Sequence, residues 1–174
     1  RLRGLSDIPI LIGILPLQAV TLNWKAATSG DWFSAANWVE GVAPTNGGED
    51  VYITNTGARV TLSNSTALLG SLTLGSPSIP SNRIFFTNWT TTLMATNITI
   101  QSNAMVFCAG PFDDTAMSNR VKFICTNLTL EMGGAIDLAG RGYKGEGDGP
   151  GGGADDASAG GAGHGGAGGW SAAA

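Results

Sequence analysis

Charged residues, cysteine and histidine are all scarce in this sequence, and each scarcity excludes a class of function. Only 13% of the 174 residues are charged, and a net charge of −4 with scattered Lys and Arg leaves no basic patch for nucleic acid or an anionic membrane surface. Two cysteines and a single histidine, His164, cannot supply the four ligands of a tetrahedral zinc site. We therefore expect no cofactor, no nucleic-acid partner and no membrane span.

The two cysteines, Cys108 and Cys125, are predicted to form a disulfide if the protein is secreted, and the alternative is a pair of buried free thiols. Asn-x-Ser/Thr sequons point to the same compartment, because they are glycan acceptors on secreted proteins. The sequons, which we predict to be surface N-glycosylation sites, begin at Asn64, Asn88, Asn97 and Asn127.

The N-terminal segment, residues 1–22, has a basic start followed by an apolar run that resembles a signal peptide. The run is too short to span a bilayer, and Pro9 and Pro16 would break a helix. The first residue is Arg, so we expect a processed chain or a fragment. A retained apolar arm must be buried, either against its own domain or as a strand added to a neighbouring subunit. The residues assigned to this contact are Ile8, Ile10, Leu11, Ile12, Ile14, Leu15, Leu17 and, near the other terminus, Trp170.

An internal repeat gives the strongest indication of the fold. The segment TNITIQSNAMVFCAG, residues 96–110, aligns with TNLTLEMGGAIDLAG, residues 126–140, and a weaker copy begins at Gly70. Apolar residues recur at every second position, as in strands with one buried face. One such unit cannot bury its own apolar face, but stacked units can. The sequence therefore predicts an all-β fold, a short parallel β-helix or solenoid, and the alternative is an antiparallel β-sandwich.

The C-terminal segment is rich in glycine, which makes up half of residues 140–169. It has neither the strict period of collagen nor the spacing of a P-loop. His164 in this segment has no nearby nucleophile or second ligand and is interpreted as a turn or packing residue. The chain is thus expected to comprise an apolar arm at 1–22, a Trp-rich cap segment at 23–50, solenoid coils at 51–140 and a glycine-rich tail at 141–174.

The Trp-rich segment LNWKAATSGDWFSAANWVEGVAPTNGGEDVYI, residues 22–53, resembles the start of large secreted repetitive surface proteins of adhesin or autotransporter type. The matching positions are Trp24, Trp32, Asn37, Trp38, Gly41, Pro44, Asp50, Val51 and Ile53. The glycine-rich tail is similar to segments of large extracellular glycine-rich proteins. These resemblances imply a segment that caps a parallel β-helix, a secreted surface or fibre protein, and no specific reaction.

Three functions are compatible with these features. The first is a non-enzymatic structural subunit of an extracellular filament, appendage or surface layer, which assembles with copies of itself through the apolar arm, the open ends of the solenoid and the glycine-rich tail. The second is a carbohydrate-binding or adhesive module, since aromatic faces can stack on sugar rings. The tryptophans considered for stacking are Trp24, Trp32, Trp38 and Trp89, although a plug at the end of the core is the favoured role for Trp32 and Trp38.

The third function is an enzyme, for which the sequence offers little. Catalysis on polysaccharides needs paired carboxylates, or a carboxylate with Arg or Lys. The candidates are Asp137 with Arg141 and Lys144, but Asp137 aligns with Phe107 one coil earlier, so no carboxylate ladder forms. Neighbouring carboxylates at Glu49 and Asp50 would point to opposite faces of a strand. The pair Asp113 and Asp114 is a weak calcium candidate, because two carboxylates on one turn are usually just solvated.

Overall fold

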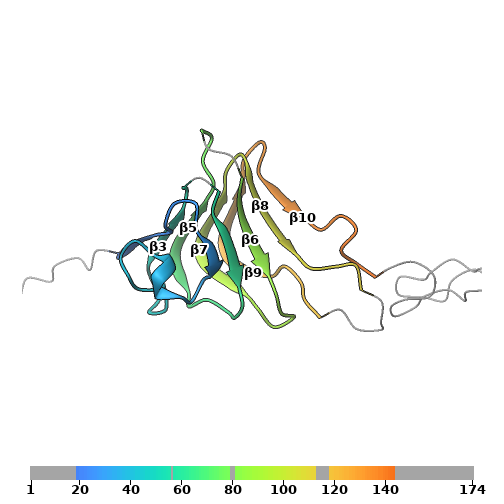
Figure 1. Ribbon diagram of the computed structural model, residues 1–174, viewed down its shortest axis with the longest axis horizontal. Coiled ribbons are helices and arrows are strands. Elements are labelled where there is room, and N and C mark those ends of the chain that lie inside the picture. The colour runs from blue at the N-terminus through green and yellow to red at the C-terminus, as the bar shows by residue number, and fades with distance from the viewer. Residues whose placement is uncertain (1–18, 56, 79–80, 113–117, 144–174) are drawn as a thin grey trace, which may run out of the picture.

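The computed structural model describes residues 19–143, with gaps at 56, 79–80 and 113–117. Within this part the protein is a parallel β-solenoid of about four turns (Figure 1). Its elements are β1 (Thr21–Asn23), β2 (Ser29–Asp31), the 3-10 turn η1 (Ala35–Asn37), β3 (Asp50–Ile53), β4 (Arg59–Leu62), β5 (Leu69–Leu74), β6 (Asn82–Phe86), β7 (Leu93–Ile100), β8 (Ala104–Cys108), β9 (Phe123–Leu130) and β10 (Ala135–Asp137).

Successive strands alternate between two five-stranded sheets, which we call the odd sheet and the even sheet. The odd sheet has the order β1-β3-β5-β7-β9, and the even sheet has the order β10-β8-β6-β4-β2. Every ladder between these named strands is parallel. The prediction of a solenoid is therefore confirmed, and the antiparallel sandwich is wrong.

The register confirms the internal repeat. In the odd sheet Ile98 pairs with Leu128, and Leu72 of the weaker copy pairs with Ile98. In the even sheet Val106 pairs with Ile136. Equivalent residues of successive turns therefore stand directly above one another, which is what a repeat of this length requires in a stack.

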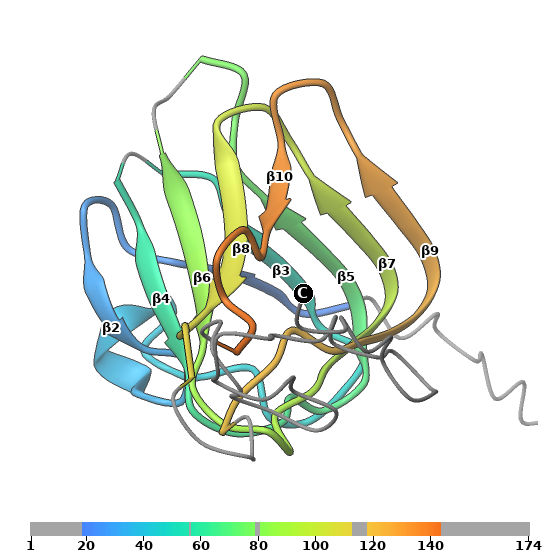
Figure 2. The same cartoon turned by 90° about the vertical axis from the view of Figure 1, so that its right-hand side faces the viewer.

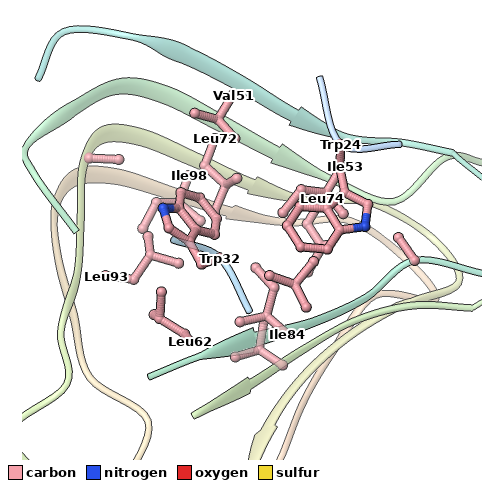
Figure 3. Packing of buried hydrophobic residues seen from close by; sticks show 14 of the residues in the cluster. Trp24, Trp32, Val51, Ile53, Leu62, Leu72, Leu74, Ile84, Leu93 and Ile98 are labelled. Atoms are coloured by element: carbon pink, nitrogen blue, oxygen red, sulfur yellow. The ribbon is translucent and has the colours of Figure 1, made fainter. Parts of the chain in front are cut away.

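The core lies between the two sheets and is built from the inward positions of each strand (Figure 3). In β3 the alternation places Val51 and Ile53 inward, and both are fully buried. The even sheet contributes Val60, Ile84 and other side chains from the opposite wall. In Figure 3 the labelled aliphatic side chains, among them Ile53 and Ile84, lie around the rings of Trp24 and Trp32, and all belong to one buried cluster.

A buried amide helps to hold the turns together. Asn82 at the start of β6 is fully buried, and its Nδ2 donates to the carbonyl oxygen of Ile53 at 3.1 Å. Its Oδ1 accepts from the backbone N–H of Ala58 at 3.0 Å. Asn82 thus links its own turn to the preceding one and satisfies two buried backbone groups where the chain passes between the sheets.

Several expected features differ in extent or lie outside the described residues. Strands β1 and β2 already pair with the second turn, so the solenoid begins before residue 51. The apolar arm up to residue 18, the aspartates at 113 and 114, Lys144, His164 and Trp170 lie outside the described residues.

Candidate functional site at the two ends of the solenoid

Three tryptophans fill the core at the N-terminal end. The side chains of Trp24, Trp32 and Trp38 have no exposed area. The Trp38 ring lies 5.0 Å from the Trp24 ring and 5.1 Å from the Trp32 ring, both in edge-to-face geometry. The Trp38 Nε1–H donates to the carbonyl oxygen of Trp32 at 2.7 Å. These rings therefore have no face free for a sugar, and their assignment as candidates for sugar stacking is wrong.

The chain that carries Trp38 also closes part of the β1 edge. The backbone N–H of Val39 donates to the oxygen of Asn23 at 2.8 Å, and the N–H of Lys25 donates to the oxygen of Asn37 at 2.9 Å. An antiparallel bridge joins Trp24 to Trp38 between these bonds. The backbone from Asn23 to Lys25 is therefore not available to another strand.

A carboxylate completes this closure. Glu40 accepts from the backbone N–H and from the side-chain amide of Asn23, both at 2.8 Å. Slight burial alone would raise the pKa of Glu40, but the hydrogen bonds from Asn23 and from its own backbone lower it. The ionised carboxylate of Glu40 is therefore the form that accepts the two hydrogen bonds from Asn23 at this edge.

The opposite end is open among the described residues (Figure 2). Strand β9 is the last strand of the odd sheet and pairs only with β7. Its inward residues Leu128 and Leu130 are 44% and 50% exposed, whereas their register partners Ile98 and Ile100 are 1% and 0% exposed. The same positions are core in one turn and surface in the next, because no described turn follows.

Further apolar side chains extend this surface, which we call the open end. Leu138 after β10 is 48% exposed, and Met132 in the connection between β9 and β10 is 96% exposed. The backbone of β9 offers eight residues of strand edge with no described neighbour. An unpaired edge beside exposed core residues is a surface suited to another β-strand. The sequence predicted open solenoid ends with exposed strand edges, but it did not single out these residues.

Both cysteines are free thiols in the structure, so the expected disulfide is not shown. Cys108 is buried at an inward position of β8, while Cys125 is partly buried on β9 in the other sheet. Burial raises the pKa of the Cys108 thiol, although the nearby Arg141 charge and the Val121 N–H oppose that rise.

The four sequons fall into two structural groups. Asn97 and Asn127 are register partners on the outer face of β7 and β9, and the Asn127 amide donates to the Asn97 oxygen at 2.8 Å. The other two, Asn64 and Asn88, lie between strands, where the Asn88 amide donates to the oxygen of Ser63 at 2.6 Å. The sequons at Asn97 and Asn127 therefore occupy the same outward position in two successive turns. Glycosylation of all four sequons remains a prediction.

The remaining candidates among the described residues have local structural contacts. Asp137 pairs with Phe107 in register, as expected, and its carboxylate accepts from the N–H of Ala139. Arg141 donates to the oxygen of Cys108 at 2.8 Å and stacks on the Phe107 ring. Glu49 is buried and accepts from the N–H of Asn46. Each of these groups has a structural contact.

Trp89 is the one tryptophan among the described residues with substantial exposure, at 40%. The guanidinium of Arg120 lies 4.4 Å from its ring centroid, and the Arg120 Nε donates to the Trp89 carbonyl oxygen. One face of the ring is therefore in contact with a cation.

Across the described residues, no group of three or more His, Cys, Asp or Glu side chains could hold a metal ion. Nor is any helix in the described part of the chain long and apolar enough to cross a bilayer.

No protein-family model, curated protein or solved structure matches this chain. The resemblance of the Trp-rich segment to adhesins and autotransporters therefore has no support from these comparisons. The parallel β-solenoid itself rests on the structure.

Proposed function

We propose that this protein is a non-enzymatic structural subunit of an extracellular filament, appendage or surface layer. The observation that carries the proposal is the open end, where Leu128 and Leu130 occupy core positions yet remain about half exposed. Solvent-exposed apolar area of this kind favours association, because burying it releases about 25 cal/mol per Å². The low charge of the chain reduces the repulsion between copies.

The occupant that we propose for the open end is the apolar arm of a second copy. Residues 8–17 contain seven Ile and Leu side chains, and a ten-residue segment can extend along the eight residues of β9. Added as a strand, the arm would pair with the β9 backbone through residues 10–15, between Pro9 and Pro16, and would cover Leu128 and Leu130. The opposite end is a poorer acceptor, since the edge from Asn23 to Lys25 is already paired.

Secretion, N-glycosylation and a role at the cell surface belong to the same proposal. They rest on the sequons, on the low charge and on the resemblance of the Trp-rich and glycine-rich segments to secreted surface proteins. The carbohydrate-binding alternative loses its strongest candidates, because three of its four tryptophans have no exposed area.

The test compares assembly of the full chain with that of Leu128→Lys, measured by light scattering after gel filtration and by electron microscopy. A charge at this position would have to be buried under the arm, so we expect filaments or oligomers to dissociate to monomers. The matched control is Ile124→Lys, which puts the same charge on the same strand but on its outward side and leaves the Asn127 sequon intact. We expect this control to assemble normally.

A second variant, Ile12→Lys, tests the occupant. Loss of assembly in both Leu128→Lys and Ile12→Lys supports the arm as the donor strand. If Ile12→Lys assembles normally while Leu128→Lys does not, the open end is an interface but the arm is not its occupant. Monomers of the unmodified chain at every concentration would overturn the proposed function itself.

A further inference from the structure

The outer face of the even sheet carries a row of positive charge beside a row of aromatic rings. Arg59 of β4 and Arg83 of β6 are register partners, so they stand side by side on neighbouring strands. Two residues further along the same face, Phe85 of β6 is the register partner of Phe107 of β8. These four side chains point away from the core, since the intervening Val60, Ile84 and Val106 are buried.

The two arginines have no acidic partner within the described part of the chain. The Arg59 side chain forms no hydrogen bond or ion pair there, and the Arg83 side chain donates only its Nε–H to the Ser81 hydroxyl at 3.0 Å. Both side chains are exposed. Like charges directly opposite each other on neighbouring strands are unfavourable. An anion placed between them would remove this repulsion and satisfy the guanidinium donors.

The carboxylates nearest in register do not serve as that anion. Asp31 of β2 pairs with Thr61, and Asp137 of β10 pairs with Phe107, so both stand in the aromatic row at its two ends. Each already accepts a backbone N–H of its own turn, from Phe33 and Ala139 respectively. Their geometry is therefore set by local turns rather than by the arginines.

The aromatic row forms a small platform. The rings of Phe85 and Phe107 lie 5.1 Å apart and are tilted by 46°. Arg141 lies 5.0 Å from the Phe107 ring centroid and is held there by its hydrogen bond to the Cys108 oxygen. The rings are half-buried, which leaves part of their area open to solvent beside the arginine pair.

These residues enclose a shallow hollow of about 130 Å³. It is lined by Arg59, Val60, Thr61, Arg83, Phe85 and Phe107. This volume is well below the several hundred Å³ of a pocket that encloses a small molecule. It suits one ring of a polymer that lies across the surface, with an anionic group directed at the arginines.

We propose that this hollow binds a carboxylate-bearing sugar ring, the uronate unit of an acidic polysaccharide. The planar guanidinium groups of Arg59 and Arg83 match the two oxygens of a carboxylate. The Phe85 and Phe107 rings offer an apolar surface to the C–H face of the sugar, and the Thr61 hydroxyl can hydrogen-bond a sugar hydroxyl. Nucleic acid, the other polymer that combines rings with anions, is bound by basic patches that neutralise several phosphates, whereas only two guanidinium groups line this hollow.

The site is independent of the proposed assembly. It lies on the outer face of the even sheet, whereas the open end is formed chiefly by the free edge and inward side chains of β9. Copies joined at their open ends would still present one hollow each. A polymer that crosses several copies would then be held by many weak contacts at once.

The experiment is a calorimetric titration of the full chain with trigalacturonate and, in parallel, with its neutral methyl ester. We expect saturable binding of the acid that weakens with added salt, and at least tenfold weaker binding of the ester. In Arg83→Gln and in Arg59→Gln we expect the affinity for the acid to fall at least tenfold. In Phe85→Ser we expect a similar loss at every salt concentration, because the stacking surface is removed.

The matched control is Arg120→Gln, which removes the same charge beside Trp89 beyond the other end of β6. We expect this variant to bind the acid as the unmodified chain does, and circular dichroism checks that every variant is folded. Equal binding of acid and ester would overturn the proposal, as would no binding of the acid at millimolar concentration. Tighter binding of a single-stranded oligonucleotide would instead assign the hollow to nucleic acid.

Discussion

At the scale of single residues, Asn82 shows how one polar side chain fixes the path of the backbone. Its amide is fully buried and bonds to the backbone of Ile53 and Ala58 in the preceding turn. A buried side-chain amide whose N–H and oxygen both have partners costs little free energy. Buried backbone groups without partners would lower stability much more. The side chain therefore acts as a bridge between turns.

We expect Asn82→Ala to lower the free energy of unfolding by roughly 1–3 kcal/mol, because the Ala58 N–H loses its buried acceptor, while the Ile53 oxygen keeps only its bond from the Gly75 N–H. Urea denaturation followed by circular dichroism measures this change. The control is Asn64→Ala at an exposed position, for which we expect about 0.5 kcal/mol or less. Similar small losses in both variants would contradict the bridging role.

Cys108 gives a prediction on pH. Burial raises the pKa of its thiol, so the unfolded chain loses this proton at a lower pH than the folded one. The contribution of the thiol to stability is therefore complete below the pKa of the unfolded state and is lost as the pH rises through the folded-state pKa. We expect the free energy of unfolding to fall at alkaline pH, and to fall less steeply in Cys108→Ala. Parallel pH profiles for the two proteins would refute this.

At the scale of strands, β7 and β9 have nearly the same sequence in their second halves but different surroundings. Ile98 and Leu128 are register partners, yet one is 1% exposed and the other 44% exposed. The difference arises only from position in the stack, since β7 has a strand on both sides and β9 has a described strand on one side.

This pair predicts unequal costs for the same truncation. Ile98→Ala opens a cavity in the core and should lower the free energy of unfolding by about 2–5 kcal/mol. Leu128→Ala removes a half-exposed side chain and should cost about 1 kcal/mol or less in dilute, unassembled protein. Thermal and chemical denaturation of both variants measure the difference. Equal losses would mean that the last turn is as fully covered as the one before it.

At the scale of the whole molecule, the repeat was enough to predict the solenoid and its register. Residues such as Val106 and Ile136 align in sequence because they stack in space, and a stack leaves little freedom in how they pair. The first turn was harder to predict. Strands β1 and β2 are only three residues each, and they lack the alternation that marks the later turns.

The candidate functional surfaces, which are the open end and the hollow beside the arginine pair, were harder to predict from the sequence for physical reasons. An aromatic-rich segment can face inward or outward, and only the packing of Trp24, Trp32 and Trp38 shows that their rings belong to the core. The exposure of Leu128 depends on whether another turn or another molecule packs on β9. The local sequence around Leu128 does not determine this. Arg59 and Arg83 are far apart in the chain and become neighbours only through the register of β4 and β6.

The hydrogen bond between Asn127 and Asn97 also bears on the order of events during biosynthesis. The nitrogen that would receive a glycan on Asn127 is the one that donates to Asn97 once β9 has docked on β7. If Asn127 is a glycan acceptor, we expect attachment there to be slower after the last turn has docked than before it, whereas Asn64 lies in an exposed connection and should show no such difference. The ratio of glycan occupancy at these two positions would therefore report how quickly β9 docks on β7 during synthesis of the chain.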